Sequence, residues 1–425
     1  MRLPTSLLPY CIMLLAWSGA PAAEFAAYRQ ITVAPHLHTR FSDGAERMSR
    51  VVRMARDAGF QAAWVTDHAD LYWKYPMAGT TVGYYRRSLW NLGFDRYLQA
   101  CRRVQKSYPG MILIPGFEAS PYYYLSGSLL GNELVVHQWQ KHLIVAGIED
   151  PKVFRGLPML AYHSSPRPGF TDEGEAPYIA FTEAVRAAGG VTFWAHPYGS
   201  AKSRIAHHVY AEVAAYTESL LTVPASNGMA VNSPSNVVTT PGGLWDRALA
   251  SYCAGERSSL PGVMVEIDFH RKEKMNRTLV LLIPADTGAD AGARKAACLD
   301  ALRAGRYYIT NAPPGKLALA NFTLSSLGGG SAAPGETLRS GGPFTISYSL
   351  TGENPIQWVR FIRNGAVVAE RSEPAGTWTE QDVPNDVPGY YRLAAQDARG
   401  RFLLSQPILY QGPGVPVKGA ATGGS

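Results

Sequence analysis

The chain has 425 residues, which is enough for two or three domains and too many for a miniprotein held together by disulfides. Its residues are 46% hydrophobic, 17% charged and 11% aromatic, with 42 Gly and 30 Pro, a composition that indicates a folded, loop-rich protein and excludes intrinsic disorder. The formal charge is +7. No cluster of Lys and Arg is interleaved with aromatic residues, so we predict no nucleic-acid partner and expect the charge to attract small anionic molecules.

The first residues resemble a secretory signal peptide. Arg2 is followed by the apolar stretch Leu7–Trp17 and by Ala20-Pro21-Ala22, a cleavage motif of small residues. A permanent membrane anchor is the alternative, but Pro9 interrupts the stretch, which is shorter than the roughly 18 residues of a span. We therefore predict a signal peptide over residues 1–22, no stable membrane insertion, and secretion across the inner membrane to the periplasm or beyond.

Short apolar runs alternate with helical patterns from residue 31 to about 310. In Ala45–Ala58, the apolar positions Met48, Val51, Val52 and Ala55 share one helix face. The alternation is typical of strand–helix units and predicts an α/β fold over residues 23–311, a distorted seven-stranded (βα)7 TIM-like barrel. An open doubly wound sheet fits the same periodicity, but its Gly-rich loop after the first strand is missing. The predicted strands are Ile31–Val33, Ala62–Thr66, Met111–Ile114, Leu143–Ala146, Val191–Trp194, Met229–Val231 and Val263–Ile267.

The pattern changes after Asn311-Ala-Pro-Pro-Gly315, where helical periodicity stops. Alternating apolar segments bounded by Gly, Pro, Asn and Asp predict a small all-β, Ig-like sandwich over residues 316–411. The tail at 412–425 is rich in Gly and Pro, and we predict that it is disordered. The expected strands of the sandwich are Leu317–Leu324, Pro343–Leu350, Ile356–Asn364, Gly389–Ala395 and Phe402–Tyr410.

Metal-binding side chains lie almost entirely just after the predicted strands of the barrel. The carboxyl ends of such strands converge on one face, so these side chains should meet there. Two histidines spaced i, i+2 in an extended segment project to the same side, and carboxylates can bridge two ions. The pattern therefore predicts a metal site built from dispersed segments. Its elements are His36-x-His38 with Asp43, Asp67-His68, Glu118, His196 and Asp268-Phe269-His270.

These motifs resemble those of the PHP (polymerase and histidinol phosphatase) superfamily, metal-dependent phosphoesterases on a distorted seven-stranded barrel. The matching segments are His36-x-His38 with Ser42-Asp43-Gly44, Thr66-Asp67-His68, Glu118, His142 in His-Leu-Ile-Val-Ala-Gly, Ala195-His196-Pro197 and Asp268-Phe269-His270. Other segments are more narrowly similar to the secreted CehA/McbA-type metallohydrolases. They are Trp245-Asp246-Arg247, Arg277-Thr278 and Ala301-Leu-Arg-Ala-Gly-Arg306, followed by the β-sandwich.

The resemblance implies a cluster of two or three divalent ions. Zn, Mn and Fe all suit mixed nitrogen and oxygen ligands. It also implies that Asp67 accepts a hydrogen bond from a ligand imidazole, and that His196 or Asp67 assists proton transfer. His142 differs from the rest because it begins its predicted strand instead of following it. The implied metal ligands are His36, His38, Asp43, His68, Glu118, His142, His196, Asp268 and His270.

The leading functional prediction is a secreted metal-dependent hydrolase that cleaves phosphomonoesters or diesters through metal-bound hydroxide. Carbamate or carboxylic ester hydrolysis at the same site is the enzymatic alternative, and a non-catalytic metal-containing binding protein is the other. The expected partner is a small, anionic ester, and the sequence leaves the oligomeric state open. Cations predicted to border the metal face, one or two of which would bind the anionic group, are Arg40, Lys74, Arg86, Arg87 and Arg204.

Overall fold

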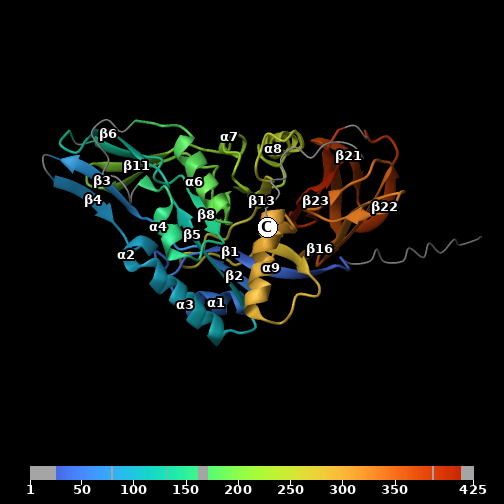
Figure 1. Ribbon diagram of the computed structural model, residues 1–425, viewed down its shortest axis with the longest axis horizontal. Helices are drawn as coiled ribbons and strands as arrows, with labels where there is room; N and C mark the ends of the chain where they lie inside the picture. Colours follow the sequence, from blue (N-terminus) through green and yellow to red (C-terminus); the bar gives the residue numbers. More distant parts are fainter. Residues whose placement is uncertain (1–24, 78–79, 132, 161–170, 385–386, 413–425) are drawn as a thin grey trace, which may run out of the picture.

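The computed structural model describes residues 25–412 except 78–79, 132, 161–170 and 385–386. The predicted signal peptide and residues 413–425 of the predicted disordered tail lie outside the described residues. The molecule is elongated (Figure 1), with a curled sheet and its helices in the middle, a group of short strands at one end and a β-rich region at the other.

Seven strands corresponding to the seven predicted ones lie side by side in the order β13-β12-β9-β8-β5-β2-β1. Six of them run in the same direction, but β8 is antiparallel to both of its neighbours, β5 and β9. The expectation of seven successive parallel units is therefore wrong at β8. The strands are β1 (Tyr28–Leu37), β2 (Ala62–Val65), β5 (Ile112–Ala119), β8 (Leu143–Ala146), β9 (Val191–Trp194), β12 (Gly228–Ala230) and β13 (Gly262–Met264).

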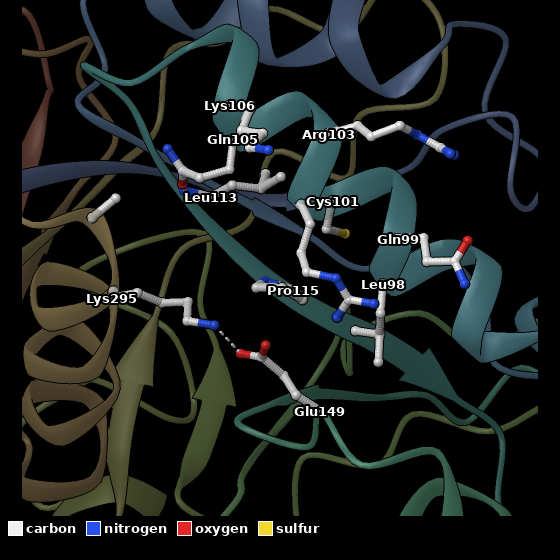
Figure 2. Close-up of a pocket in the computed structure, with 13 residues that line it drawn as sticks. Leu98, Gln99, Cys101, Arg103, Gln105, Lys106, Leu113, Pro115, Glu149 and Lys295 are labelled. Atoms are coloured by element: carbon white, nitrogen blue, oxygen red, sulfur yellow. Dashed lines mark hydrogen bonds and ion pairs between the residues drawn. The ribbon is translucent and has the colours of Figure 1, made fainter.

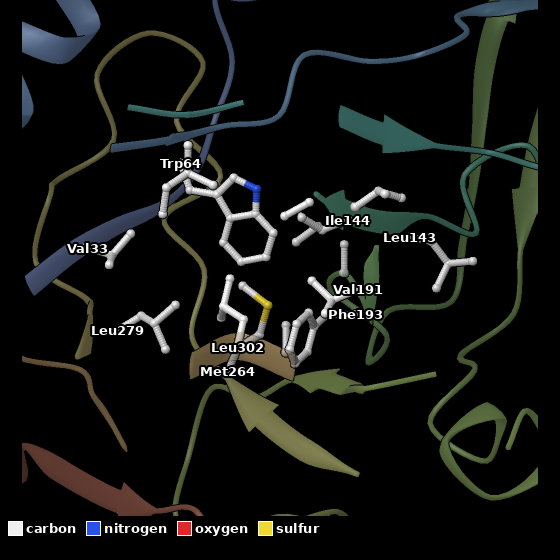
Figure 3. Packing of buried hydrophobic residues seen from close by; sticks show 14 of the residues in the cluster. Val33, Trp64, Leu143, Ile144, Val191, Phe193, Met264, Leu279 and Leu302 are labelled. Carbon is white, nitrogen blue, oxygen red and sulfur yellow. The ribbon is translucent and has the colours of Figure 1, made fainter. Parts of the chain in front are cut away.

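The sheet curls until the segment after β13 meets the end of β1. Leu37 and Phe269 form a parallel bridge. The His38 N–H donates to the Phe269 carbonyl at 2.9 Å, and the Phe269 N–H donates to the His36 carbonyl at 3.1 Å. Large apolar side chains, among them Trp64 and Phe193, fill the interior (Figure 3). Each buried side chain of this size contributes about 1.5–3 kcal/mol, and together they fix the strands whose ends carry the polar residues.

Helices cover the outside of this sheet, and α1 shows how the sequence dictates them. Its buried residues Met48, Val51, Val52 and Ala55 are those predicted from the helical spacing, and Gly59 follows the helix with a φ of 89°. No helix in the described residues is both long and apolar enough to cross a membrane. The helices are α1 (Met48–Asp57), α2 (Leu89–Leu92), α3 (Phe94–Ser107), α4 (Pro151–Gly156), α6 (Ala176–Ala187), α7 (Ser219–Thr222), α8 (Leu244–Cys253) and α9 (Ala291–Ala304).

Three pairs of short strands that the sequence did not predict stand beside the barrel (Figure 1). One pair forms a separate hairpin, and the other two form a sheet in the order β10-β11-β7-β6. They share a small hydrophobic core that includes Trp73, Tyr123 and Trp139. The strands are β3 (Tyr72–Met77), β4 (Thr80–Tyr85), β6 (Tyr124–Ser128), β7 (Glu133–His137), β10 (Ala201–Ala206) and β11 (Val209–Val213).

Two further strands, β14 (Thr278–Pro284) and β15 (Tyr307–Thr310), extend the barrel sheet beyond β1 and were also not predicted. Side chains of β14 alternate between two cores: Leu279 and Leu281 face the barrel core, whereas Val280 and Leu282 face the C-terminal core. Because β15 pairs with β24, the barrel sheet continues into the β-rich region. The predicted domain boundary at residues 311–316 therefore does not separate two sheets, because one sheet runs through both the barrel and the β-rich region.

The C-terminal region is all-β, as predicted. A sheet in the order β17-β16-β19-β22 shares a buried core with β24, β23 and β20 of the long sheet. The five predicted strands correspond to β16, β19, β20, β23 and the pair β24 and β25, whereas β17, β18, β21 and β22 were not expected. Its strands are β16 (Leu317–Ser326), β17 (Ser331–Ala332), β18 (Thr337–Leu338), β19 (Phe344–Gly352), β20 (Ile356–Arg363), β21 (Ala366–Arg371), β22 (Ala375–Glu380), β23 (Gly389–Asp397), β24 (Phe402–Ser405) and β25 (Ile408–Tyr410).

A buried ion pair joins α8 to β23. Arg392, which is fully buried, donates to both carboxylate oxygens of Asp246, at 2.7 Å from Nε and 2.6 Å from Nη2. The Tyr390 hydroxyl also donates to Asp246, at 2.9 Å, and the Gly242 N–H donates at 2.8 Å. The Arg392 guanidinium lies 4.7 Å from the centre of the Trp245 ring. The negative charge of Asp246 is thus compensated by donors on several sides, as a buried ion pair requires.

Candidate metal centre

The Glu118 carboxylate lies at the centre of five imidazoles. Glu118 is on the inner face of β5, near its carboxyl end, and is 1% exposed. Its two oxygens contact different histidines, so one carboxylate can bridge two groups of ligands. Oε2 lies 3.4 Å from His36 Nε2, 3.3 Å from His38 Nε2 and 3.2 Å from His68 Nδ1, and Oε1 lies 3.0 Å from His142 Nδ1 and 3.1 Å from His196 Nε2.

Two more carboxylates complete the cluster. Asp43 lies 3.6 Å from His38 Nδ1, 3.7 Å from His68 Nε2 and 3.3 Å from His270 Nε2. Asp268 Oδ1 lies 3.5 Å from the Nε2 atoms of both His36 and His38. The structure thus brings together all nine residues that the sequence suggested as metal ligands.

Within the described residues, the cluster contains three overlapping groups whose ligand atoms lie within 4.8 Å of one another. His196 is in none of them, but its Nε2 contacts Glu118. The groups are His38, Asp43, His68 and His270; His36, His38 and Asp268; and His68, Glu118 and His142.

The donor atoms suit cations. Asp268 Oδ1 is buried and has no hydrogen-bond partner among the described residues, which is costly unless a cation faces it. The Nε2 atoms of His36 and His38 lie 3.0 Å apart, so at most one proton can lie between them. Mixed imidazole and carboxylate ligands accept Zn, Mn and Fe, and the geometry does not choose among these metals.

The reversed direction of β8 explains why His142 precedes its strand. The other ligands lie at or just beyond the carboxyl ends of strands that run in one direction, and these ends share one rim of the barrel. Since β8 runs antiparallel to β5 and β9, its beginning lies at that same rim. His142 Nδ1 therefore reaches Glu118, at 3.0 Å, and His196 Nε2, at 3.3 Å.

Three ligands have backbone conformations that non-glycine residues rarely adopt. The φ angles are 62° at His36, 30° at His196 and 52° at Asp268. At His36 the pairing of β1 with β2 shifts register between Ala34 and Leu37, an irregularity that re-aims a side chain. Each positive φ costs of order 1–3 kcal/mol, and it is tolerated here because neighbouring strands hold the backbone.

Glu266 is a site residue that sequence reasoning missed. Its Oε2 lies 3.1 Å from His36 Nδ1, and its Oε1 accepts from the His196 N–H at 2.9 Å. A proton held on Nδ1 by this carboxylate leaves Nε2 of His36 free to bind a metal. The sequence carried a signal for Glu266, because it lies two residues before Asp268, at the end of the predicted strand Val263–Ile267, where alternate side chains point to the same side.

Asp67 does not contact a ligand imidazole in the way we expected. Its carboxylate, fully buried, accepts from the Thr39 N–H at 2.8 Å, from the Thr39 hydroxyl at 2.7 Å and from the Ser42 hydroxyl at 2.7 Å. Burial raises the pKa of Asp67 despite these donors. Asp67 thus holds the loop after β1. It acts on His38 through its charge and through Ser42, which donates to Asp67 and whose Oγ lies 3.4 Å from His38 Nδ1.

The charges of the cluster depend on one another. Burial opposes ionisation of Glu118, but His142, His36 and His68 outweigh it and hold the pKa well below its usual range. Burial likewise opposes the charge on His196, yet Glu118 and Glu266 raise its pKa to about 9. At His68 burial dominates and lowers the pKa to about 3. Bound metal ions would replace the protons that now balance the carboxylates.

The cluster forms one wall of a cavity of about 310 Å³. The unexpected strand pairs supply the other walls: Tyr84 and Arg86 come from the β3–β4 hairpin, and Arg204 and Ile205 come from β10. Trp139, which follows β7, also lines it. Two of the cations predicted to border the metal face thus line the cavity. The other three, Arg40, Lys74 and Arg87, are not among its lining residues.

Comparison with known proteins places the motifs in a family. Residues 35–145 match the PHP domain, the segment that carries His36, His38, Asp43, His68, Glu118 and His142. No curated protein matches the chain.

Solved structures with low sequence identity resemble the chain. A two-domain protein from Bacteroides vulgatus, described as containing a PHP-like metal-dependent phosphoesterase, is 12% identical over 92% of this chain and 96% of its own, with a TM-score of 0.39. A protein from Bifidobacterium adolescentis described as a metal-dependent phosphoesterase is 16% identical over 66% and 97%, with a TM-score of 0.31. Fibronectin(III)-like modules of Clostridium thermocellum CbhA are 18% identical over 21% and 94%, with a TM-score of 0.16.

The narrower likeness to the CehA/McbA-type group is not tested by these matches and stays a prediction. The broader resemblance is confirmed, because the matched segment contains six of the nine clustered ligands, from His36 to His142. Residues 35–145 therefore match the PHP domain, as the motifs in that segment predict.

Proposed function

We propose that this protein is a metal-dependent hydrolase that cleaves small phosphate esters. The observation that carries the proposal is the meeting of three donor groups around Glu118 on the wall of a cavity that also contains Arg86 and Arg204. Structural metal sites are usually closed by four ligands. Nine clustered ligands, seven of which line a cavity, instead suit ions that remain accessible to a substrate.

Two or three divalent ions held by these groups would supply a Lewis acid and an activated water at neutral pH. The protein's own residues would orient the reaction. Glu118 fixes the spacing of the donor groups, because each of its oxygens serves different histidines. His196, whose side chain is 36% exposed and lies 3.1 Å from Glu118 Oε1, is placed to hold a proton and give it to the leaving oxygen.

The cavity walls favour an anionic ester. Arg86 and Arg204 are the only Lys or Arg side chains that line the cavity in the described part of the chain, and guanidinium groups bind phosphate oxygens with paired hydrogen bonds. Leu71, Tyr84 and Trp139 line the same space and would exclude water from the substrate. The two guanidinium groups favour phosphate esters over neutral carbamates or carboxylic esters.

The test replaces His38 by Ala, with His207→Ala as the matched control. His38 belongs to two of the three donor groups, whereas His207 is exposed beside the turn between β10 and β11. We expect H38A to lose both bound metal and phosphate-ester hydrolysis, and H207A to keep both. Metal content would be quantified, and turnover measured on matched aryl phosphates, carbamates and carboxylic esters with added Mn²⁺ or Zn²⁺.

Other outcomes of this experiment would overturn the proposal. Faster turnover of carbamates or carboxylic esters than of phosphates would assign the alternative reaction. A single non-exchangeable ion without any hydrolysis would indicate a binding protein. Full activity of H38A would show that the cluster is not the catalytic site.

We further infer that the protein acts outside the cytoplasm. The support is the sequence of residues 1–22, with its basic start, apolar stretch and small-residue motif. N-terminal sequencing of protein from the periplasm or medium should begin near Ala23. Intact Met1 on cytoplasmic protein would contradict this inference.

A further inference from the structure

A second cavity, of about 600 Å³, opens on the outer wall of the barrel between α3 and α9 (Figure 2). It shares no lining residue with the metal cavity. Along β5 the side chains alternate, so that Glu118 faces the metal centre while Leu113 and Pro115 line the outer cavity. Its volume falls in the range of small-molecule sites.

The cavity exists because the chain does not cross the barrel after β5. From the carboxyl end of β5 the chain makes the β6–β7 hairpin and returns as the antiparallel strand β8, so no crossover helix follows β5. Both α3 and α9 pack against β5. Between them, part of its outer face has no helix over it.

The floor of this cavity is apolar and its wall is preformed. Leu98, Cys101, Leu113 and Pro115 are buried residues that line it. Gln105 ties α3 to β5, because its side chain accepts from the Leu113 N–H at 2.9 Å and donates to the Met111 carbonyl at 2.8 Å. A ligand would therefore find an apolar surface whose shape is already set.

The rim of the cavity is positively charged. Lys295 pairs with Glu149, the one acidic residue among the lining residues, at 2.5 Å (Figure 2). Arg102, Arg103 and Lys106 are exposed lining residues, and no ion pair of theirs occurs within the described chain. Arg102 and Lys106 are spaced i, i+4, so they lie on one face of α3. The charge of the rim complements an anion.

We propose that this outer cavity binds a single-chain anionic amphiphile, an alkyl carboxylate, with its chain on Leu98, Leu113 and Pro115 and its carboxylate held by Arg102 and Lys106. An apolar floor beside unpaired cations matches an apolar chain that ends in an anion. The proposal is independent of the hydrolase function, since no residue is shared between the two cavities.

Decanoate is the probe, titrated into the full chain by calorimetry below the concentration at which it forms micelles. We expect saturable binding of one decanoate per chain. The double variant R102Q/K106Q should weaken it by at least about tenfold, the loss expected for charge-assisted hydrogen bonds. The matched control is R53Q/R96Q, which removes the same charge from exposed residues that do not line the cavity. Its affinity should equal that of the wild type.

A second variant tests the apolar part of the site. Ala291 lines the cavity at the first turn of α9 and is half-buried, so A291W should fill the space without disturbing the barrel core. It should prevent binding of decanoate and of uncharged decanol alike. Thermal unfolding would verify that each variant is folded.

Three results would overturn the proposal. The first is the absence of saturable decanoate binding to the wild type. The second is equal affinity in the wild type, R102Q/K106Q and A291W. The third is association only with micelles or lipid vesicles, which would assign the cations to a membrane surface instead of a cavity ligand.

Discussion

Two clusters of buried charge lie in different parts of the molecule, and they differ in how their charges are balanced. At the junction of α8 and β23, the carboxylate of Asp246 receives hydrogen bonds from Arg392, Tyr390 and the Gly242 N–H. At the rim of the barrel, three carboxylates and six imidazoles face one another with no Lys or Arg among them. In the first cluster both carboxylate oxygens of Asp246 are paired with Arg392, whereas in the second Asp268 Oδ1 has no hydrogen-bond partner among the described residues.

The backbone shows the same contrast. At the rim, His36, His196 and Asp268 have positive φ angles, whereas neither Asp246 nor Arg392 does. Strain of this kind persists where the surrounding fold enforces it and is concentrated at functional sites. A buried charge that is paired and unstrained thus indicates a structural joint, and a strained, incompletely paired cluster indicates a binding site.

The same chemical change in both clusters should separate these roles. Glu118→Gln removes the negative charge that five imidazoles contact while keeping the side chain's size. We expect complete loss of hydrolysis together with loss of bound metal, measured by metal quantification and turnover. A variant that retained metal and activity would show that Glu118 does not organise the centre.

Asp246→Asn makes the matching change at the junction. Arg392 would then be a buried cation without its carboxylate, and breaking a buried pair costs about 3–5 kcal/mol. We expect the free energy of unfolding to fall by that amount, measured by urea denaturation, with metal content and kcat per folded molecule unchanged. Loss of activity without loss of stability would reverse the assignment of the two clusters.

Glu266→Gln should have an intermediate effect. An amide can still contact His36 Nδ1 and the His196 N–H, but it lacks the charge that stabilises the imidazole as a ligand. Replacing a residue that orients a metal ligand typically lowers metal affinity by about 10- to 100-fold. Competition with a chelator would measure the Kd, and Glu183→Gln, on the exposed face of α6, is the matched control. An unchanged Kd would restrict Glu266 to a structural role.

Much of the barrel and of the metal centre could be predicted from the sequence. The seven barrel strands were predicted because each is a short apolar run bounded by polar residues, and the ligands were predicted because they follow these strands. The direction of β8 could not be predicted, since a run such as Leu143–Ala146 is apolar on both faces and carries no mark of orientation. The strain at His36 and His196 was equally invisible, because it arises from contacts with distant segments.

The elements that shape the cavity were the least predictable. No residue of the strand β10 is fully buried, and its sequence lacks the apolar and polar alternation that indicates a strand. The family resemblance assigned Asp67 to a ligand imidazole, yet its hydrogen-bond partners are Thr39 and Ser42. The motif alone did not reveal which groups the folded loop brings to the carboxylate.

The smallest expected effect is at the cavity wall, and it tests whether the unpredicted strands serve the metal centre. Arg86→Gln removes a cavity cation that also lies 5.3 Å from the centre of the Tyr84 ring. Because this contact binds substrate and transition state alike, we expect KM to rise by about three- to tenfold with kcat nearly unchanged. Arg87→Gln, which changes the adjacent exposed residue outside the cavity lining, should leave both constants unaltered. Equal effects of the two variants would mean that the β3–β4 hairpin contributes only general positive charge, and the substrate would then be recognised by the metal centre alone.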